Sequence, residues 1–357
     1  MQAGHCWVNS EMMELMWTIG NLGNRVARRC VAEFRRLGGY FAVMAEAMRL
    51  RRKKYPLRSR GGRMVRKYYT DRHMTGIKEG VICFYDGRIY HGGLTDRIRG
   101  LLSVYEEARR RGIPFYISWT HPFRLEDYLL PAGKDWRIAP QDISYCREDS
   151  FPVIIQDLGD GVSTLYLRSA LHSRLPQTHV YSNQDSGRGR YRELFKELFV
   201  PSPALKAEVD RHLAVLGKDY VVFAFRFVGL LGDFRDWKRI YLSGDRRSRF
   251  LGRVAAELKT LMAEVPAGRR ILITADSDTF LEYIAPADAR IYIVPGSVRH
   301  MDLEKAGADV WMKTFVDQLL IMNASKVTLM RTGEMYNSGF SRFAAEVGGV
   351  PFIYHEF

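Results

Sequence analysis

The chain has 357 residues, of which 46% are hydrophobic and 26% are charged, a composition typical of a folded protein with about two domains. Its net charge of +14 is concentrated between Arg25 and Arg72, where 16 Lys and Arg stand against three acids, so the rest of the chain is nearly neutral. No apolar run approaches the roughly 20 residues that span a bilayer, and the acidic N-terminus does not resemble a signal peptide, so we expect a cytoplasmic protein.

Residues 1–79 are predicted to form a basic helical extension. Basic residues beside apolar ones suit an anionic membrane surface, so residues 25–72 could hold the protein peripherally on the inner face of a membrane. A solvated basic tail explains the same composition equally well. Nucleic-acid binding is not expected, because no recognisable reader module accompanies the charge.

A βαβ unit opens the folded part of the chain. Val81–Tyr85 reads as a strand, and the glycine pair Gly92 and Gly93 allows a tight turn or a close approach to a ligand. The next stretch has apolar residues at helical spacing, with Asp96 at the positive end of the helix. Phe115–Trp119 then reads as a second strand.

Polar residues follow this second strand, and residues 80–200 are predicted to form one α/β domain. In parallel sheets, ligands bind at the carboxyl ends of the strands. His121, Arg124 and Asp127 are therefore candidates for ligand-binding residues, although surface polar residues or a local ion pair would give the same pattern. Pro201 and Pro203 interrupt a helical pattern, which predicts a boundary near residue 200.

A second α/β series is predicted over residues 201–357, and it begins with a strand at Tyr220–Val228. Arg226 is the only charged residue of this apolar run. A buried guanidinium is costly unless it meets an anion, so Arg226 is predicted either to bind a ligand anion at the strand end or to form a core salt bridge.

The next predicted strand, Arg270–Thr274, runs into Asp276, Ser277 and Asp278. A DxD sequence at a strand end can hold Mn²⁺ through its carboxylate oxygens. Ser277 or Asp278 could equally be the N-cap of the following helix. The pattern alone leaves both interpretations open.

The last predicted elements are a helix over Phe315–Asn323 containing Asp317, a strand over Lys326–Met330, and a turn at Asn337–Ser341 that leads into another helix. A Ser-Gly turn at a helix N-terminus offers backbone N–H groups, a hydroxyl and a favourable dipole to a phosphate. An unoccupied serine cap is the alternative.

Some motifs of familiar chemistry are missing from the sequence. The four cysteines, Cys6, Cys30, Cys83 and Cys146, form no CxxC or CxxH pattern, so neither a zinc site nor a disulfide framework is predicted. The sequence has no P-loop, HExxH helix or GxSxG elbow, which argues against nucleotide hydrolysis, zinc proteolysis and lipase-type chemistry.

The segments GGLTDRIRGLLSVYEEA and FYISWTHPFRLEDYL resemble the nucleotide-sugar-dependent fucosyltransferases of the nodulation and core α1,6 type. Arg226 matches the arginine of that family's V-H-x-R motif, but Ala224 stands where histidine is usual. Asp276 and Ser277 match a donor-facing segment of the family, and a helix with an aspartate, a strand and a serine turn follow in the family's order. The resemblance covers roughly residues 80–357.

The resemblance implies a GT-B architecture, in which two Rossmann-like domains face a central cleft. The donor would be a nucleoside-diphosphate sugar, foremost GDP-fucose, bound by residues 201–357. The acceptor would be a glycan or glycolipid held by residues 80–200, with His121, Arg124 and Asp127 as acceptor-side residues. Transfer would be inverting and independent of metal, with no cofactor. Arg226 would stabilise the leaving diphosphate, and Asp233 or Asp96 would act as the base. The full set of expected donor-binding residues is Gly92, Gly93, Arg226, Asp276, Ser277, Asp317, Ser338, Gly339, Phe340, Ser341 and Arg342.

Two other functions remain open. Because Ala224 departs from the family motif, the chain could be a degenerate homologue that binds a sugar nucleotide without turnover. The protein could also be a basic membrane- or nucleic-acid-associated binding protein, with the extension as its functional part.

Overall fold

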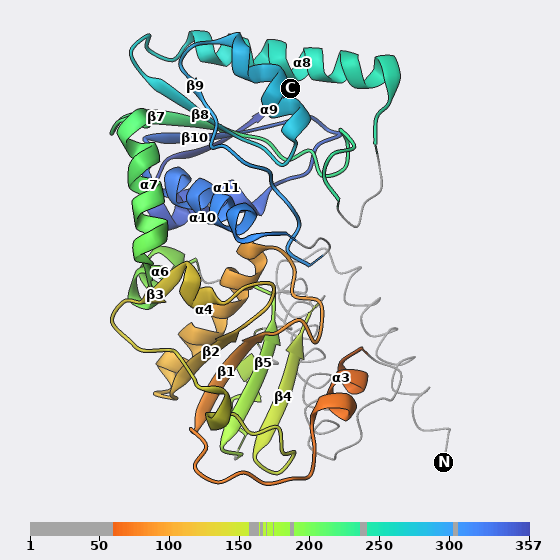
Figure 1. The fold of residues 1–357 in the computed structure, drawn as a ribbon, viewed down its shortest axis with the longest axis vertical. Coiled ribbons are helices and arrows are strands. Elements are labelled where there is room, and N and C mark those ends of the chain that lie inside the picture. The colour runs from red at the N-terminus through yellow and green to blue at the C-terminus, as the bar shows by residue number, and fades with distance from the viewer. Residues whose placement is uncertain are drawn as a thin grey trace, which may run out of the picture.

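A computed structural model describes residues 60–357, apart from 157–163, 165–166, 169, 174, 186–188, 236–240 and 303–305 (Figure 1). The proposed membrane contact over residues 25–72 therefore lies mostly outside the described residues. Among the described residues, no helix is both long enough and apolar enough to cross a membrane.

The first sheet has four parallel strands in the order β2-β1-β5-β4. Its strands are β1 (Gly80–Tyr85), β2 (Phe115–Trp119), β4 (Ser150–Ile155) and β5 (Gln177–Ser182). The helix α4 (Leu94–Arg110) connects β1 to β2, so the predicted βαβ unit is present. The short 3₁₀ helices η1 (Leu125–Asp127) and η2 (Pro140–Asp142) lie in the following connection.

Both faces of the first sheet are covered. Successive side chains of β1 point to opposite faces of the sheet, and all of them are buried. Val81, Cys83 and Tyr85 pack in the core shared with α4, while Ile82 and Phe84 pack in a second cluster on the other face. That second cluster includes Met64, Val65 and Tyr69, which belong to or follow α3 (Arg60–Tyr68). The last part of the predicted extension is thus packed against the first sheet.

The crossing between the two halves contains the helix α6 (Tyr191–Leu198), the strand β6 (Phe199–Pro201) and the helix α7 (Pro203–Leu216). The strand β6 pairs antiparallel with β3 (Leu129–Pro131). Pro203 is accommodated in the first turn of α7, where Ser202 is the N-cap and accepts a hydrogen bond from the Leu205 N–H. The predicted boundary near residue 200 falls between the two main sheets.

The second sheet has five parallel strands in the order β11-β10-β7-β8-β9. Its strands are β7 (Tyr220–Ala224), β8 (Arg270–Thr274), β9 (Ile291–Tyr292), β10 (Lys326–Arg331) and β11 (Phe352–Glu356). Its helices are α8 (Gly244–Ala263), α9 (Asp278–Ile284), η3 (Ala285–Ala287), α10 (Ala308–Asn323) and α11 (Gly339–Gly348). Tyr220, Val222 and Ala224 of β7 face α10 and α11, and Val221 and Phe223 face α8 and α9.

Two predicted boundaries were wrong. The strand expected over Tyr220–Val228 ends at Ala224, because the backbone N–H groups of Phe227 and Val228 bond the Asp276 carboxylate in place of a ladder partner. The helix expected from Phe315 begins at Ala308, which puts Asp317 in the helix interior.

The two sheets are joined by one continuous apolar core. Figure 1 shows α10 and α11 between the sheets, with α4 and α6 on the side of the first sheet. Aromatic pairs cross this layer: Tyr128 stacks on Phe315 at a centroid distance of 4.6 Å, and Tyr191 meets Phe343 edge-on at 5.3 Å. The two halves therefore pack closely and are not separated by a flexible linker.

Candidate active site

A cavity of about 880 Å³ is lined by residues of both halves of the chain. The first half contributes the start of α4, and the second half contributes the carboxyl ends of β7 and β8 and the start of α11. Carboxyl ends of parallel strands and N-termini of helices are the usual ligand-binding edge of an α/β sheet. The volume is in the range of small-molecule and cofactor sites.

The N-termini of α4 and α11 approach each other in this cavity. A Cβ atom added to Gly339 would lie 3.8 Å from Nη1 of Arg99 and 4.0 Å from Cγ2 of Thr95. At α4 the N-cap is Gly93, which has no side chain to occupy the free N–H groups. At α11 the Ser338 hydroxyl caps the Phe340 N–H. Two positive helix ends therefore face one space.

Each of these two helix ends also carries a buried hydroxyl without a partner among the described residues. Thr95 is 6% exposed and Ser341 is 2% exposed, and neither side-chain oxygen has a hydrogen-bond partner there. Both residues line the cavity. Because buried hydroxyls are normally hydrogen-bonded, these two are ready to contact a polar ligand.

Both positive and negative side chains line the cavity. The lining arginines are Arg99, Arg226, Arg299 and Arg342, and the lining acids are Asp96, Asp185, Asp276, Asp317 and Glu346. Nη2 of Arg99 donates to Asp185 at 2.5 Å, and Nη1 of Arg226 lies 3.0 Å from Oδ2 of Asp276. The guanidinium of Arg226 also lies over the ring of Phe234, 4.5 Å from its centroid. These contacts hold two guanidinium groups at the cavity wall.

Asp276 organises the loop that carries Arg226. Its carboxylate accepts the N–H groups of Phe227 and Val228, both at 2.7 Å, in addition to the Arg226 ion pair. Val228 has φ +60°, an unfavourable value for a β-branched residue, which these bonds hold in place. Burial raises the pKa of Asp276, while Arg226 acts in the opposite direction. The side chain therefore supports Arg226 and is largely occupied by protein groups.

Asp96 and Glu346 line the cavity with a raised pKa. Burial is the main cause for both groups. Around Asp96, the positive charges of Arg99 and Arg226 act in the opposite direction. A carboxyl group whose pKa is shifted toward neutrality beside arginines is a candidate for proton transfer.

Asp317 lines the cavity from the middle of α10. Its carboxylate pairs with Nζ of Lys313 at 3.0 Å, and the same ammonium donates to the Val294 carbonyl at 2.9 Å. Burial raises the pKa of Asp317, and Lys313 opposes that effect. The pair fixes the chain before α10 against the helix.

The structure brings ten of the sequence-predicted donor-binding and catalytic residues to the cavity. They are Gly93, Asp96, Arg226, Asp276, Asp317, Ser338, Gly339, Phe340, Ser341 and Arg342. Gly92, Ser277 and Asp233 do not line it. Ser277 caps α9 and donates its hydroxyl proton to Asp233 at 2.8 Å, and Asp233 also accepts the Thr279 N–H. Both side chains thus stabilise the start of α9.

None of the three predicted acceptor-side residues lines the cavity. The ring of His121 lies 4.0 Å from Asp302, and burial lowers its pKa. Arg124 makes a long 4.0 Å contact with Glu126, and the Asp127 carbonyl accepts a hydrogen bond from Ser202. Their role on the acceptor side therefore stays a prediction.

Asp302 is an important residue that sequence reasoning missed. Its Oδ2 accepts the N–H groups of His91 at 2.8 Å and Gly92 at 2.5 Å, and its Oδ1 accepts Nη2 of Arg97 at 2.7 Å. Arg97 is fully buried. The glycine turn therefore binds a carboxylate from the other half of the chain. No sequence pattern predicts this contact between the turn and Asp302.

Arg99 is the second omission. It lies one helical turn after Asp96 on the same face of α4, so the spacing i, i+3 could have identified it. Several other unpredicted lining residues are aromatic or basic, namely Tyr90, Phe234, Arg299, His300 and Tyr336. They come from loops, whose positions a local pattern does not give.

No protein-family profile and no curated protein sequence matches the chain. Among solved structures, NodZ alpha-1,6-fucosyltransferase soaked with GDP-fucose is similar, with a TM-score of 0.51 and 14% identity over 77% of this chain and 94% of that chain. A mutant of Arabidopsis thaliana FUT1 in complex with GDP is also similar, with a TM-score of 0.51 and 13% identity over 88% of this chain and 78% of that chain. The chain therefore has a fold like that of the GT-B fucosyltransferases.

Proposed function

We propose that the protein is a glycosyltransferase that binds a nucleoside-diphosphate sugar in the cavity between its two sheets. The observation that carries the proposal is the convergence of the α4 and α11 N-termini on one cavity, with Arg99 and Arg226 at its wall. Each helix end carries about half a positive charge, and with the arginines they suit a diphosphate. The two similar structures, one soaked with GDP-fucose and the other in complex with GDP, favour GDP-fucose as the donor.

In such a transfer, the bond between the sugar and the diphosphate breaks, and negative charge develops on the leaving diphosphate. Fixed donors that face this charge stabilise the transition state. Arg226, the Ser338 turn and the orphan hydroxyls of Thr95 and Ser341 would supply such donors. Because arginines and helix dipoles could fulfil this role, we propose that transfer is independent of metal.

An inverting transfer needs a base beside the acceptor hydroxyl, and we propose Asp96. Its carboxyl lines the cavity near Arg226, and its raised pKa makes it a better base than an ordinary aspartate. Asp233, the other predicted base, is engaged at the start of α9. The acceptor, a glycan or glycolipid, would approach from the side of residues 80–200. A role for His121, Arg124 and Asp127 in binding it stays a prediction.

Calorimetric titration without added metal tests donor binding. GDP and GDP-fucose are expected to bind in preference to UDP, CDP and dTDP. Arg226→Ala should weaken GDP binding by roughly 10- to 150-fold, because a hydrogen bond to a charged group contributes about 1.5–3 kcal/mol. Arg253→Ala is the matched control, since this arginine pairs with Glu334 on the surface and does not line the cavity.

The same titrations, together with a transfer assay, distinguish the alternatives. If no nucleotide binds to the unaltered protein with or without Mn²⁺, the transferase proposal fails. If GDP-fucose binds but no sugar reaches any acceptor of a glycan panel, the degenerate homologue is supported. Asp96→Asn should keep GDP affinity and lose transfer. In the active enzyme, transfer should decline as the pH falls through the raised pKa of Asp96, at a higher pH than an ordinary aspartate at about 4 would give.

A further inference from the structure

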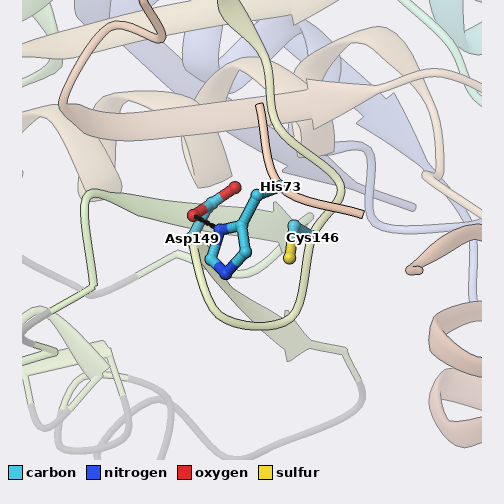
Figure 2. Close-up of side chains that lie close together, drawn as sticks. All are labelled: His73, Cys146 and Asp149. Atoms are coloured by element: carbon cyan, nitrogen blue, oxygen red, sulfur yellow. Dashed lines mark hydrogen bonds and ion pairs between the residues drawn. The ribbon is translucent and has the colours of Figure 1, made fainter. Parts of the chain in front are cut away.

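A cluster of side chains that can bind a metal lies away from the cavity. His73 belongs to the segment between α3 and β1, and Cys146 and Asp149 belong to the turn before β4. One possible ligand atom from each residue lies within 4.8 Å of the others. Figure 2 shows the imidazole ring of His73 hydrogen-bonded to Asp149, with the Cys146 sulfur close by. None of these residues lines the cavity.

The turn that carries two of the residues is held by its own hydrogen bonds. The Asp149 N–H and the Ser150 N–H both donate to the Cys146 carbonyl, at 3.2 and 2.9 Å. Oδ2 of Asp149 accepts the Ser144 hydroxyl at 2.7 Å and the Met74 N–H at 3.3 Å. Cys146 is 1% exposed and Asp149 is 7% exposed. The thiol and the carboxylate are thus positioned before any ion arrives.

The third residue is oriented from both sides. Nδ1 of His73 lies 2.7 Å from Oδ1 of Asp149, and Nε2 lies 2.7 Å from Oε2 of Glu148. If Nδ1 binds an ion, Glu148 is left to accept the hydrogen of Nε2. A carboxylate that holds the free nitrogen of a metal-bound histidine is a common feature of zinc sites.

We propose that His73, Cys146 and Asp149 form a Zn²⁺ site in which Glu148 orients the histidine. Thiolate, imidazole and carboxylate together favour zinc over magnesium or calcium, which prefer oxygen ligands. Zinc bonds of about 2.0–2.3 Å place the ligand atoms roughly 3.3–3.7 Å apart in a tetrahedron. Nδ1 of His73 and Oδ1 of Asp149, now 2.7 Å apart, would therefore separate slightly, while the ligand atoms that are further apart, all within 4.8 Å, would draw together. A water molecule completes the fourth position.

The site would act structurally. The segment that contains His73 joins α3 to β1, and the Thr70 N–H donates to the Tyr145 carbonyl beside the turn. An ion shared by His73 and the 146–149 turn would fasten the end of the basic extension to the first sheet. This role is separate from sugar transfer, so the two proposals can fail independently.

Cobalt titration of the full-length protein after EDTA treatment tests the site. One Co²⁺ per chain should bind and give the absorption of a cobalt–thiolate bond, and Zn²⁺ should displace it. Cys146→Ser should abolish the thiolate absorption. His73→Asn should also remove tight binding, and because His73 is more than half exposed, this variant should fold. Glu148→Gln should keep the site with about 10- to 100-fold weaker zinc affinity.

Two controls separate this site from other metal-binding groups. The double variant Cys6→Ser and Cys30→Ser should retain the thiolate absorption, as should His355→Gln, which changes a histidine paired with Glu257 elsewhere. Zinc should raise the melting temperature of the unaltered protein and of both controls, but not of Cys146→Ser or His73→Asn. If Cys146→Ser keeps the cobalt–thiolate absorption, or the unaltered protein binds no zinc, the proposal is overturned.

Discussion

Asp302 is predicted to be among the most important single side chains for joining the two halves of the protein. It accepts two backbone N–H groups of the glycine turn and one N–H of Arg97, all from the first half of the chain. The substitution Asp302→Ala removes these three bonds at once. It also leaves the guanidinium of Arg97, which has no exposed surface, without its carboxylate.

The expected loss follows from that burial. Removing one partner of a buried ion pair costs about 3–5 kcal/mol, because the remaining charge stays uncompensated. Arg97 keeps bonds to the carbonyls of Gly92 and His121, at 2.9 and 2.5 Å, which should hold the loss near the lower end of that range. Asp302→Asn should cost less, because an amide oxygen can still accept the two backbone N–H groups.

Urea denaturation of the unaltered protein, Asp302→Ala and Asp302→Asn measures the free energy of unfolding of each. Asp210→Ala is the matched control: it also removes an aspartate from an ion pair, but Lys206 and Asp210 are 67% and 54% exposed. This surface change should alter the free energy by less than about 1 kcal/mol. Equal losses for Asp302→Ala and Asp210→Ala would refute the argument from burial.

Further predictions concern two glycines and a buried histidine. Gly348→Ala should destabilise the fold by at least about 1–3 kcal/mol, because its Cβ would lie 2.2 Å from the Met322 carbonyl oxygen of α10, whereas Gly252→Ala on α8, with nothing within 4 Å, should stabilise it by up to about 1 kcal/mol. Thermal unfolding of both variants checks this. Burial lowers the pKa of His179 to about 3, so the unfolded chain binds a proton first as the pH falls below about 6.5. Between pH 7 and pH 5, His179 alone should lower the free energy of unfolding by about 2 kcal/mol. The variant His179→Gln should lack this contribution; an unchanged pH profile in that variant would contradict the assignment.

Elements with a strong local pattern could be predicted from the sequence. The βαβ unit was recognised because the apolar spacing of α4 and the two apolar strands are each complete within a short segment. The serine turn before α11 was recognised for a similar reason, since Ser338 and the following glycine form a local capping signal. These two local patterns contain seven of the ten predicted residues that line the cavity: Gly93, Asp96, Ser338, Gly339, Phe340, Ser341 and Arg342.

The ends of elements could not be read in the same way. The apolar run after Tyr220 continues past the strand, because Phe225 and Phe227 pack in the core although the ladder ends at Ala224. What ends the strand is Asp276, about fifty residues later, which accepts the N–H groups that would otherwise extend it. Arg226 therefore lies beyond the carboxyl end of β7 and beside the cavity. Hydrophobic periodicity alone would have placed it within the buried strand.

The metal cluster shows the same limit at a longer range. Cysteine spacing predicted no zinc site, and that inference is sound for ligands grouped in one segment. His73 and the 146–149 turn are brought together by the parallel bridge between Thr70 and Cys146, which depends on how the chain enters the first sheet. A ligand set divided between two distant segments leaves no spacing to recognise.

The glycine turn shows how a motif can be identified while its contacts are missed. Gly92 and Gly93 were predicted to bind the donor, and the two residues differ in the structure. Gly93 lines the cavity at the start of α4, whereas the Gly92 N–H is occupied by Asp302. Gly92 has φ +80°, so its conformation directs the turn around that carboxylate. The turn thus joins the two halves at the same point where α4 presents its free N–H groups, which makes the geometry of the proposed donor site dependent on the Asp302 contact.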